Sequence, residues 1–214
     1  MPWRLRRGSD QAAGPRREFA DPREPAPPLY RSPTLKVLVS RLSSEVPHHV
    51  LDLGGASGAN VEFFARFSSR LQIVDLPDAL ASQELRALLT VNPAAAFRRL
   101  LPPPSGPFDV VLAWDLLNYL TREQCGRLAV YLEDVCGRDA LVLAFVSTSR
   151  EMSAAPLVFK IVDAQTLLLQ PRTPAVRSSP LLAPAEVEHL MTGFAVVQSV
   201  LMRHGIREYL FVRR

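Results

Sequence analysis

The chain has 214 residues, 48% of them hydrophobic, which matches one α/β domain with a modest extension and is enough to bury a core. No apolar run approaches the roughly 20 residues that a bilayer crossing requires, so no membrane span is expected. The formal net charge is +4, and residues 1–34 supply +3 of it, from seven Arg minus four acids. The remainder is nearly neutral, so composition gives no support to a nucleic-acid-binding face.

The cysteines and the first residues indicate a compartment. Cys125 and Cys136 are two isolated thiols outside any CxxC or Cys/His cluster, which favours a reducing environment and argues against a zinc site. Residues 1–10 alternate arginine with polar residues and contain no apolar signal core. We therefore expect a cytoplasmic protein without a bound metal.

The N-terminal segment differs in composition from the rest. Residues 1–31 are rich in Arg, Pro and Gly and have few apolar anchors, so we expect a disordered tail ahead of a single domain at 32–214. Ser32 as a helix cap, Pro33 at the first helical position and apolar residues at helical spacing predict a helix that ends before Pro47.

Strands and helices then alternate along the chain. The pattern predicts strands at 48–55, 71–75, 94–101, 108–114 and 139–146. It predicts helices at 60–69, 79–89, 121–136 and 183–193, of which the third begins with a Thr121 cap and Gln124 in a capping box. The end of the chain, 194–202 and 206–214 around Gly205, reads as a β-hairpin.

This alternation predicts an α/β fold. We expect a doubly wound, mainly parallel seven-stranded sheet with helices on both faces and a C-terminal antiparallel β-hairpin. Ligands of such folds lie outside the carboxyl ends of the strands. The long segment 147–184 follows the fifth strand, so it is expected to be an insertion that covers a substrate.

A glycine-rich turn follows the first strand. Three of the ten glycines lie within Val50–Asn60, which reads VLDLGGASGAN. Glycine lets the backbone approach a ligand at a helix N-terminus, so a nucleotide-like ligand fits. The stretch fails the dinucleotide pattern G-x-G-x-x-G, and no Lys follows to make a phosphate-binding loop.

The turn resembles the first motif of the class I S-adenosylmethionine-dependent methyltransferases, with Ala56 in place of the middle glycine. The resemblance extends over about 35–214. It includes Asp75 after the second strand, the fourth strand FDVVLAW and the terminal hairpin. It implies that Asp75 accepts hydrogen bonds from both ribose hydroxyls, a role that suits a carboxylate because it has two acceptor oxygens. The cofactor-binding residues implied are Asp52, Gly54, Gly55, Gly58, Asp75, Leu76 and Asp115.

Two details are similar to the small-molecule O-methyltransferases, namely the Gly54-Gly55 pair and Asp75-Leu76-Pro77. Asn118 stands where the catalytic histidine of that group lies, and an amide cannot accept a proton near neutral pH. Arg98 and Arg99 stand near the place of an acid that receives the adenine amino group. No residue is therefore assigned as the catalytic base.

The sequence thus predicts an S-adenosylmethionine-dependent methyltransferase, a monomer or homodimer, that acts on a small-molecule acceptor. One alternative is a methyltransferase-like binding or regulatory protein that has lost catalysis. Another is an RNA or protein methyltransferase docked by the Arg-rich tail, although AWDL after the fourth strand lacks the Asn-Pro-Pro-Tyr-type motif of base methylation.

Overall fold

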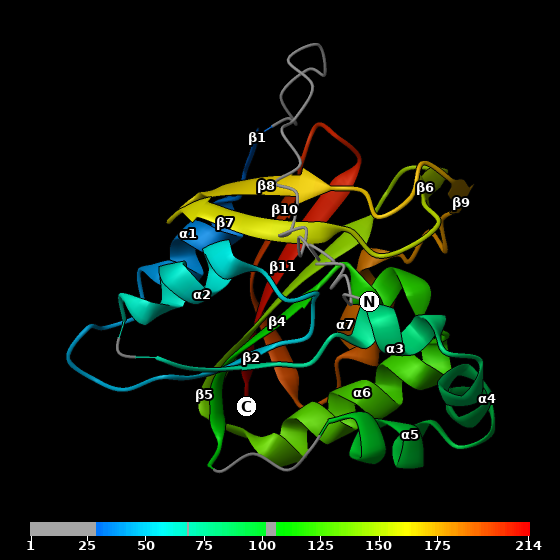
Figure 1. Ribbon diagram of the computed structural model, residues 1–214, viewed down its shortest axis with the longest axis horizontal. Helices are drawn as coiled ribbons and strands as arrows, with labels where there is room; N and C mark the ends of the chain where they lie inside the picture. Colours follow the sequence, from blue (N-terminus) through cyan, green and yellow to red (C-terminus); the bar gives the residue numbers. More distant parts are fainter. Residues whose placement is uncertain (1–28, 68, 102–105) are drawn as a thin grey trace, which may run out of the picture.

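The protein is built around a twisted sheet with helices on both faces (Figure 1). The computed structural model describes residues 29–67, 69–101 and 106–214. The central sheet has six strands in the order β10-β11-β5-β4-β2-β3. Its strands are β2 (His49–Asp52), β3 (Arg70–Ile73), β4 (Phe108–Trp114), β5 (Cys136–Ser147), β10 (Phe194–Leu201) and β11 (Ile206–Arg213). The pairs β2–β3, β2–β4 and β4–β5 are parallel, whereas the terminal hairpin pairs antiparallel with β5.

Helices cover both faces of this sheet. They are α1 (Pro33–Val39), α2 (Gly58–Ala65), α3 (Leu76–Ala81), α4 (Gln83–Val91), α5 (Pro93–Leu100), α6 (Arg122–Val135) and α7 (Pro184–Leu190), with a 3-10 turn η1 (Leu116–Tyr119) after β4. None of the described helices is long and apolar enough to cross a membrane. No group of three or more metal-ligating side chains gathers among the described residues.

Alternation along the strands divides the core in two. Leu51, Val111 and Val142 belong to one buried cluster, with side chains of α4–α7. Their neighbours Val50 and Val110 point to the opposite face and join the cluster that contains side chains of α1, α2 and β7. Successive side chains of a strand point to opposite faces, so a sheet covered on both sides is apolar at consecutive positions.

The predicted third strand is wrong. Residues 94–101 fall almost entirely in the helix α5, which begins where the Asn92 side chain accepts a hydrogen bond from the Ala95 amide, with Pro93 in the first turn. Asn at the cap and Pro just inside are strong helix-start signals, and alanine is the best helix former. The central sheet therefore has six strands instead of seven, and β3 and β10 are its edges.

Two further boundaries differ from expectation. The predicted helix at 79–89 is divided between α3 and α4, because Ser82 has an extended backbone. The predicted tail, 1–31, mostly lies outside the described residues, but Leu29–Arg31 form the strand β1, which pairs antiparallel with β8.

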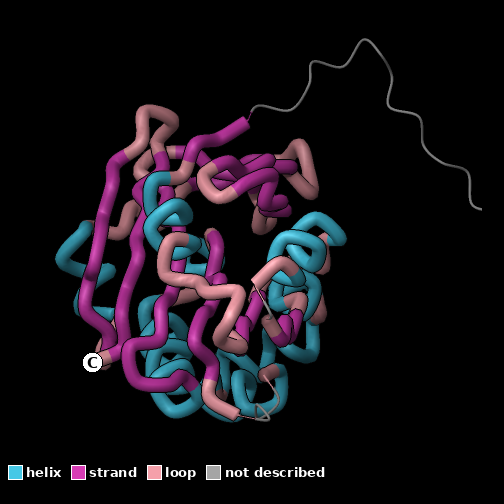
Figure 2. The backbone as a smooth tube through the Cα atoms, turned by 90° about the vertical axis from the view of Figure 1, so that its left-hand side faces the viewer, coloured by secondary structure: helices cyan, strands magenta, loops and turns pink. Residues whose placement is uncertain are grey.

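The segment 147–184 adds two small sheets. Its strands are β6 (Glu151–Ser153), β7 (Val158–Asp163), β8 (Thr166–Gln170) and β9 (Val176–Ser178). They form the sheets β1-β8-β7 and β6-β9. Figure 1 labels these strands near one end of the central sheet, and Figure 2 turns this view by 90°. That end is the carboxyl end of β4, because Trp114, the last residue of β4, stacks on Phe159 of β7 with ring centroids 4.9 Å apart.

Candidate functional site

The glycine turn packs directly on the end of β4. A Cβ at Gly54 would lie 2.6 Å from Trp114 Cδ1, so only glycine lets the indole lie this close. A Cβ at Gly55 would overlap the guanidinium of Arg172 from the insertion. At Gly58, which begins α2, a Cβ would meet nothing within 4 Å. At Gly54 and Gly55, the missing Cβ atom therefore leaves room for a side chain from elsewhere in the chain.

Asp52 ends β2 and is fully buried. Its Oδ1 accepts hydrogen bonds from the Gly54 amide (2.9 Å) and Trp114 Nε1 (2.6 Å), and its Oδ2 accepts one from Asn60 Nδ2 (3.2 Å). Burial raises the pKa of this carboxyl, and the three hydrogen bonds oppose that rise. Asp52 therefore holds the turn, the end of β4 and the start of α2 together.

Trp114 has a strained backbone. Its φ of 48° lies in the left-handed region, which costs a bulky residue on the order of 1–3 kcal/mol. Its buried ring stacks on Phe159, within 9° of parallel, and its indole N–H is bound to Asp52. The structure puts its ring in the core, against the glycine turn.

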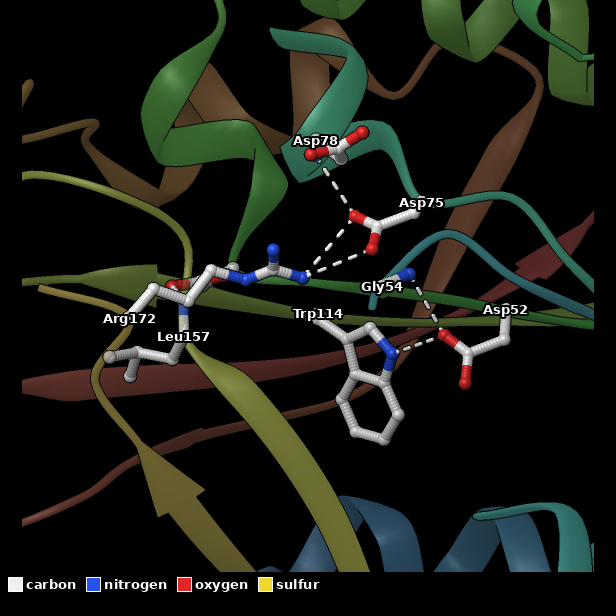
Figure 3. Close-up of polar contacts among 8 residues, drawn as sticks. Asp52, Gly54, Asp75, Asp78, Trp114, Leu157 and Arg172 are labelled. Atoms are coloured by element: carbon white, nitrogen blue, oxygen red, sulfur yellow. Dashed lines mark hydrogen bonds and ion pairs between the residues drawn. The ribbon is translucent and has the colours of Figure 1, made fainter. Parts of the chain in front are cut away.

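Asp75 follows β3 and caps α3, where its Oδ1 accepts a hydrogen bond from the Asp78 amide (2.9 Å). Both of its oxygens also accept from Arg172 Nη2, at 3.2 and 3.3 Å (Figure 3). Arg172 was not predicted as a site residue, since nothing in its local sequence marks it. Its guanidinium lies against the carboxylate that the resemblance assigns to the ribose.

Leu76 and Asp115 lie in different surroundings. Leu76, the first residue of α3, is buried in the core, so its side chain faces apolar neighbours. Asp115 directly follows β4 and is only 7% exposed. Its Oδ2 accepts hydrogen bonds from the Leu157 amide (3.1 Å) and the Tyr119 hydroxyl (3.5 Å), whereas its Oδ1 is buried without a partner among the described residues.

The pKa of Asp115 differs from that of an ordinary carboxyl group. Burial raises its pKa to about 7, against the hydrogen bonds from the Leu157 amide, its own amide and Tyr119 and the positive charge of Arg172. A carboxyl with this pKa exists in both protonation states near neutral pH, as a general acid or base requires.

Asn118 has a structural role. Its Nδ2 donates to the carbonyls of Asp115 (2.8 Å) and Phe145 (3.0 Å), and its Oδ1 accepts from the Ser147 amide (2.8 Å). The side chain is buried and ties η1 to the end of β5.

Tyr119 and residues of the insertion take part in the lining of two cavities. One, of about 170 Å³, adjoins Asp115 and the ends of β5 and β11. The other, of about 380 Å³, lies between α3, α4 and the loop after β6, with Arg86 and Arg177 in its wall. Neither of these two cavities is lined by Asp52, Asp75 or the glycines of the turn.

Comparison with known proteins defines the fold. No family model and no curated protein matches the sequence. The chain superposes on an S-adenosylmethionine-dependent methyltransferase from Clostridium acetobutylicum ATCC 824 with a TM-score of 0.51 and 12% identity, over 84% of this chain and 90% of the other. The PH0226 protein from Pyrococcus horikoshii OT3 gives a TM-score of 0.52 at 12% identity, over 85% and 88%.

The pyocyanin biosynthetic protein PhzM is similar at a TM-score of 0.46 and 18% identity. Here the match covers 85% of this chain but 54% of PhzM. The six-stranded sheet with its terminal hairpin and the superposition on the Clostridium enzyme define the class: the chain has the fold of a class I methyltransferase.

Proposed function

We propose that this chain binds S-adenosylmethionine at the carboxyl ends of β2 and β3 and transfers its methyl group to a small molecule. The observation that carries the proposal is the placement of two carboxylates. Asp52 ends β2 opposite Ile73 of β3, and Asp75 follows two residues beyond Ile73, with the glycine turn beginning beside them. Ligands of doubly wound folds bind at this edge of the sheet.

The contacts of Asp75 support a diol as its ligand. A carboxylate offers two acceptor oxygens to the two hydroxyls of a ribose. In the structure both oxygens accept from Arg172, so a donor already occupies the place proposed for the hydroxyls. The cofactor must therefore displace the Arg172 side chain, which extends from the insertion and is 28% exposed.

The chemistry asks little of the protein beyond alignment. The sulfonium already makes the methyl carbon electrophilic, so orienting the acceptor in line and excluding water supplies much of the rate. The insertion, whose Arg172 contacts Asp75, would help to exclude water from the proposed site. Because Asn118 is fully engaged in structural bonds, a route through a base at this position is not part of the proposal.

Calorimetry tests the proposal. S-adenosylmethionine should bind the wild-type chain, and Asp75→Asn should weaken binding by about tenfold or more, since the amide has one acceptor oxygen and adds a donor. Asp78→Asn is the matched control, because only its main-chain amide contacts Asp75. Absence of binding to the wild type at millimolar cofactor would contradict the proposal.

A second candidate is a methyltransferase-like binding protein without catalysis. The observation that favours it is that Arg172 and Trp114 fill the space beside Gly54 and Gly55. In this case neither the wild type nor Arg172→Ala binds S-adenosylmethionine, although both are folded. The alternative of docking on RNA depends on residues 1–31, of which the structure describes 29–31.

A further inference from the structure

The smaller cavity lies beside the proposed cofactor site. Its wall combines Asp115 after β4, Phe145 of β5, Leu157 and Phe159 of the insertion, and His204 in the turn between β10 and β11. Asp115 directly follows Trp114, which packs on the glycine turn, and the charge of Arg172 acts on Asp115 while its guanidinium binds Asp75. Asp115 therefore connects the cavity to the side chains that pack on the proposed cofactor site.

Two polar atoms in the wall are unsatisfied. Asp115 Oδ1 and Ser153 Oγ are buried and have no hydrogen-bond partner among the described residues. A buried polar group without a partner is costly, so such groups are nearly always paired in folded proteins. An ionised carboxylate oxygen can only accept. A ligand that satisfies Asp115 Oδ1 in the ionised state must therefore donate a hydrogen bond.

The charges of the wall favour a cation over an anion. The cavity is lined by the carboxyl groups of Asp115 and Glu151, and its lining contains His204 but neither Lys nor Arg. Phe145 and Phe159, whose ring centroids lie 5.2 Å apart, supply an apolar aromatic part of the lining. A cation is attracted to the carboxylates.

The volume limits the size of the ligand. At about 170 Å³ the cavity is smaller than the roughly 300–1,000 Å³ of pockets for drug-sized molecules. An engineered cavity of about 150 Å³ in another protein holds one benzene. A single ring with a short substituent therefore fills this space.

We propose that this cavity is the methyl-acceptor pocket and that its substrate is a small amine, with an apolar or aromatic body, whose N–H donates to Asp115. The methyl-transfer step rests on the proposed function, whereas the binding of the amine in this cavity does not. The assignment moves Asp115 from the cofactor-binding residues implied by the resemblance to the acceptor side of the site.

The transfer balances with the groups present. An ammonium substrate first gives a proton to the Asp115 carboxylate, which frees the nitrogen lone pair. The lone pair attacks the methyl carbon of S-adenosylmethionine, the N–C bond forms, and the C–S bond breaks with its electron pair passing to sulfur. The products are a neutral thioether and a methylated ammonium, and Asp115 afterwards releases its proton to water.

Groups on every side of Asp115 set its proton affinity. Tyr119 and the Leu157 amide donate to it, Arg172 adds positive charge, and Glu151 and His204 lie in the same wall. The balance leaves its pKa at about 7, which suits a group that must take a proton near neutral pH.

Binding of three isosteres to the full chain without cofactor tests the pocket. Benzylamine, benzyl alcohol and benzoate should bind in that order when followed by ligand-observed NMR, with benzoate weakest. Asp115→Asn, which keeps an oxygen for the Leu157 amide, should weaken benzylamine by about tenfold or more. The control Asp134→Asn, an exposed position on α6, should leave binding unchanged.

The outcomes separate the pocket from the proposed function. The assignment is overturned if benzylamine does not bind at a concentration of about 10 mM. It is also overturned if benzoate binds at least as well as benzylamine, or if Asp115→Asn leaves the affinity for benzylamine unchanged. Leu157→Trp, which fills the cavity, should also abolish benzylamine binding, and retained binding would contradict the location. If benzylamine binds as expected but S-adenosylmethionine does not, the pocket stands and the methyltransferase proposal fails.

Discussion

At the scale of single residues, the glycine turn packs against Trp114 at the end of β4, and it is also the predicted cofactor-binding turn. Gly54 and Gly55 resemble a methyl-donor motif in sequence, and the structure gives each a close neighbour from another element: Trp114 and Arg172. The close approach of Trp114 to Gly54 is sterically demanding because the indole is buried, stacked and hydrogen-bonded.

Gly54→Ala should destabilise the protein by about 1–3 kcal/mol, since the new Cβ would lie 2.6 Å from a buried ring that cannot move freely. Urea unfolding measures the change. Gly126→Ala is the matched control, because a Cβ there meets nothing within 4 Å and alanine is favoured inside the helix α6. Equal stability of the two variants would show that the indole does not pack as described.

At the scale of elements, the sequence predicts the periodic ones well. β4, α6 with its Thr121 capping box and the terminal hairpin all form where periodicity and capping indicate. The predicted strand at 94–101 fails because Asn92-Pro93 begins a helix, a local signal that the expectation of a third strand overrode. The candidate site residues Asp52, at the end of β2, and Asp75, just after β3, could be predicted because the strands that position them have a clear apolar pattern.

The contacts of the insertion could not be read from the sequence. Arg172, Leu157 and Phe159 reach the strand ends through tertiary packing, and Asn60 joins them by bonding the Phe159 carbonyl (3.1 Å) and the Ile161 amide (2.8 Å). Short strands such as β6 and β9 have three residues each, too few to show a period. The positions of Trp114 and Arg172 beside Gly54 and Gly55 therefore follow from the tertiary structure and could not be predicted from the sequence.

Asn118→Ala tests the link between η1 and β5. The change removes three buried side-chain hydrogen bonds, and the Asp115 carbonyl keeps only the bond from the main-chain amide of residue 118. We therefore expect a loss of about 2–4 kcal/mol in the free energy of unfolding. Chemical denaturation measures it, with the exposed Glu123→Ala as the control, expected within about 0.5 kcal/mol of wild type. A loss as small as that of the control would contradict the structural role.

At the scale of the whole molecule, Asp115 should make stability depend on pH. Its pKa is about 7 when folded against 3.8 for the ordinary group, so the folded state binds the proton more tightly. Stability therefore falls as pH rises between about 4 and 7, by up to roughly 4 kcal/mol from this group. Asp115→Asn should flatten that fall in thermal unfolding followed across this range. An unchanged profile would contradict the described burial.

The ion pair of Arg172 and Asp75 joins the insertion to the segment that follows β3. The two side chains are 28% and 36% exposed, so the pair contributes at most about 1 kcal/mol to stability. Its weakness matters for function, because a ligand that binds Asp75 can displace Arg172 at small cost.

Titration of S-adenosylhomocysteine into wild type and Arg172→Ala tests this account most directly. Removing the competing guanidinium should tighten binding severalfold, since the pair it breaks is worth at most about 1 kcal/mol. Arg150→Ala, an exposed position in the same insertion, should bind like wild type. Equal or weaker binding by Arg172→Ala would contradict the claim that Arg172 occupies the place of the ribose hydroxyls.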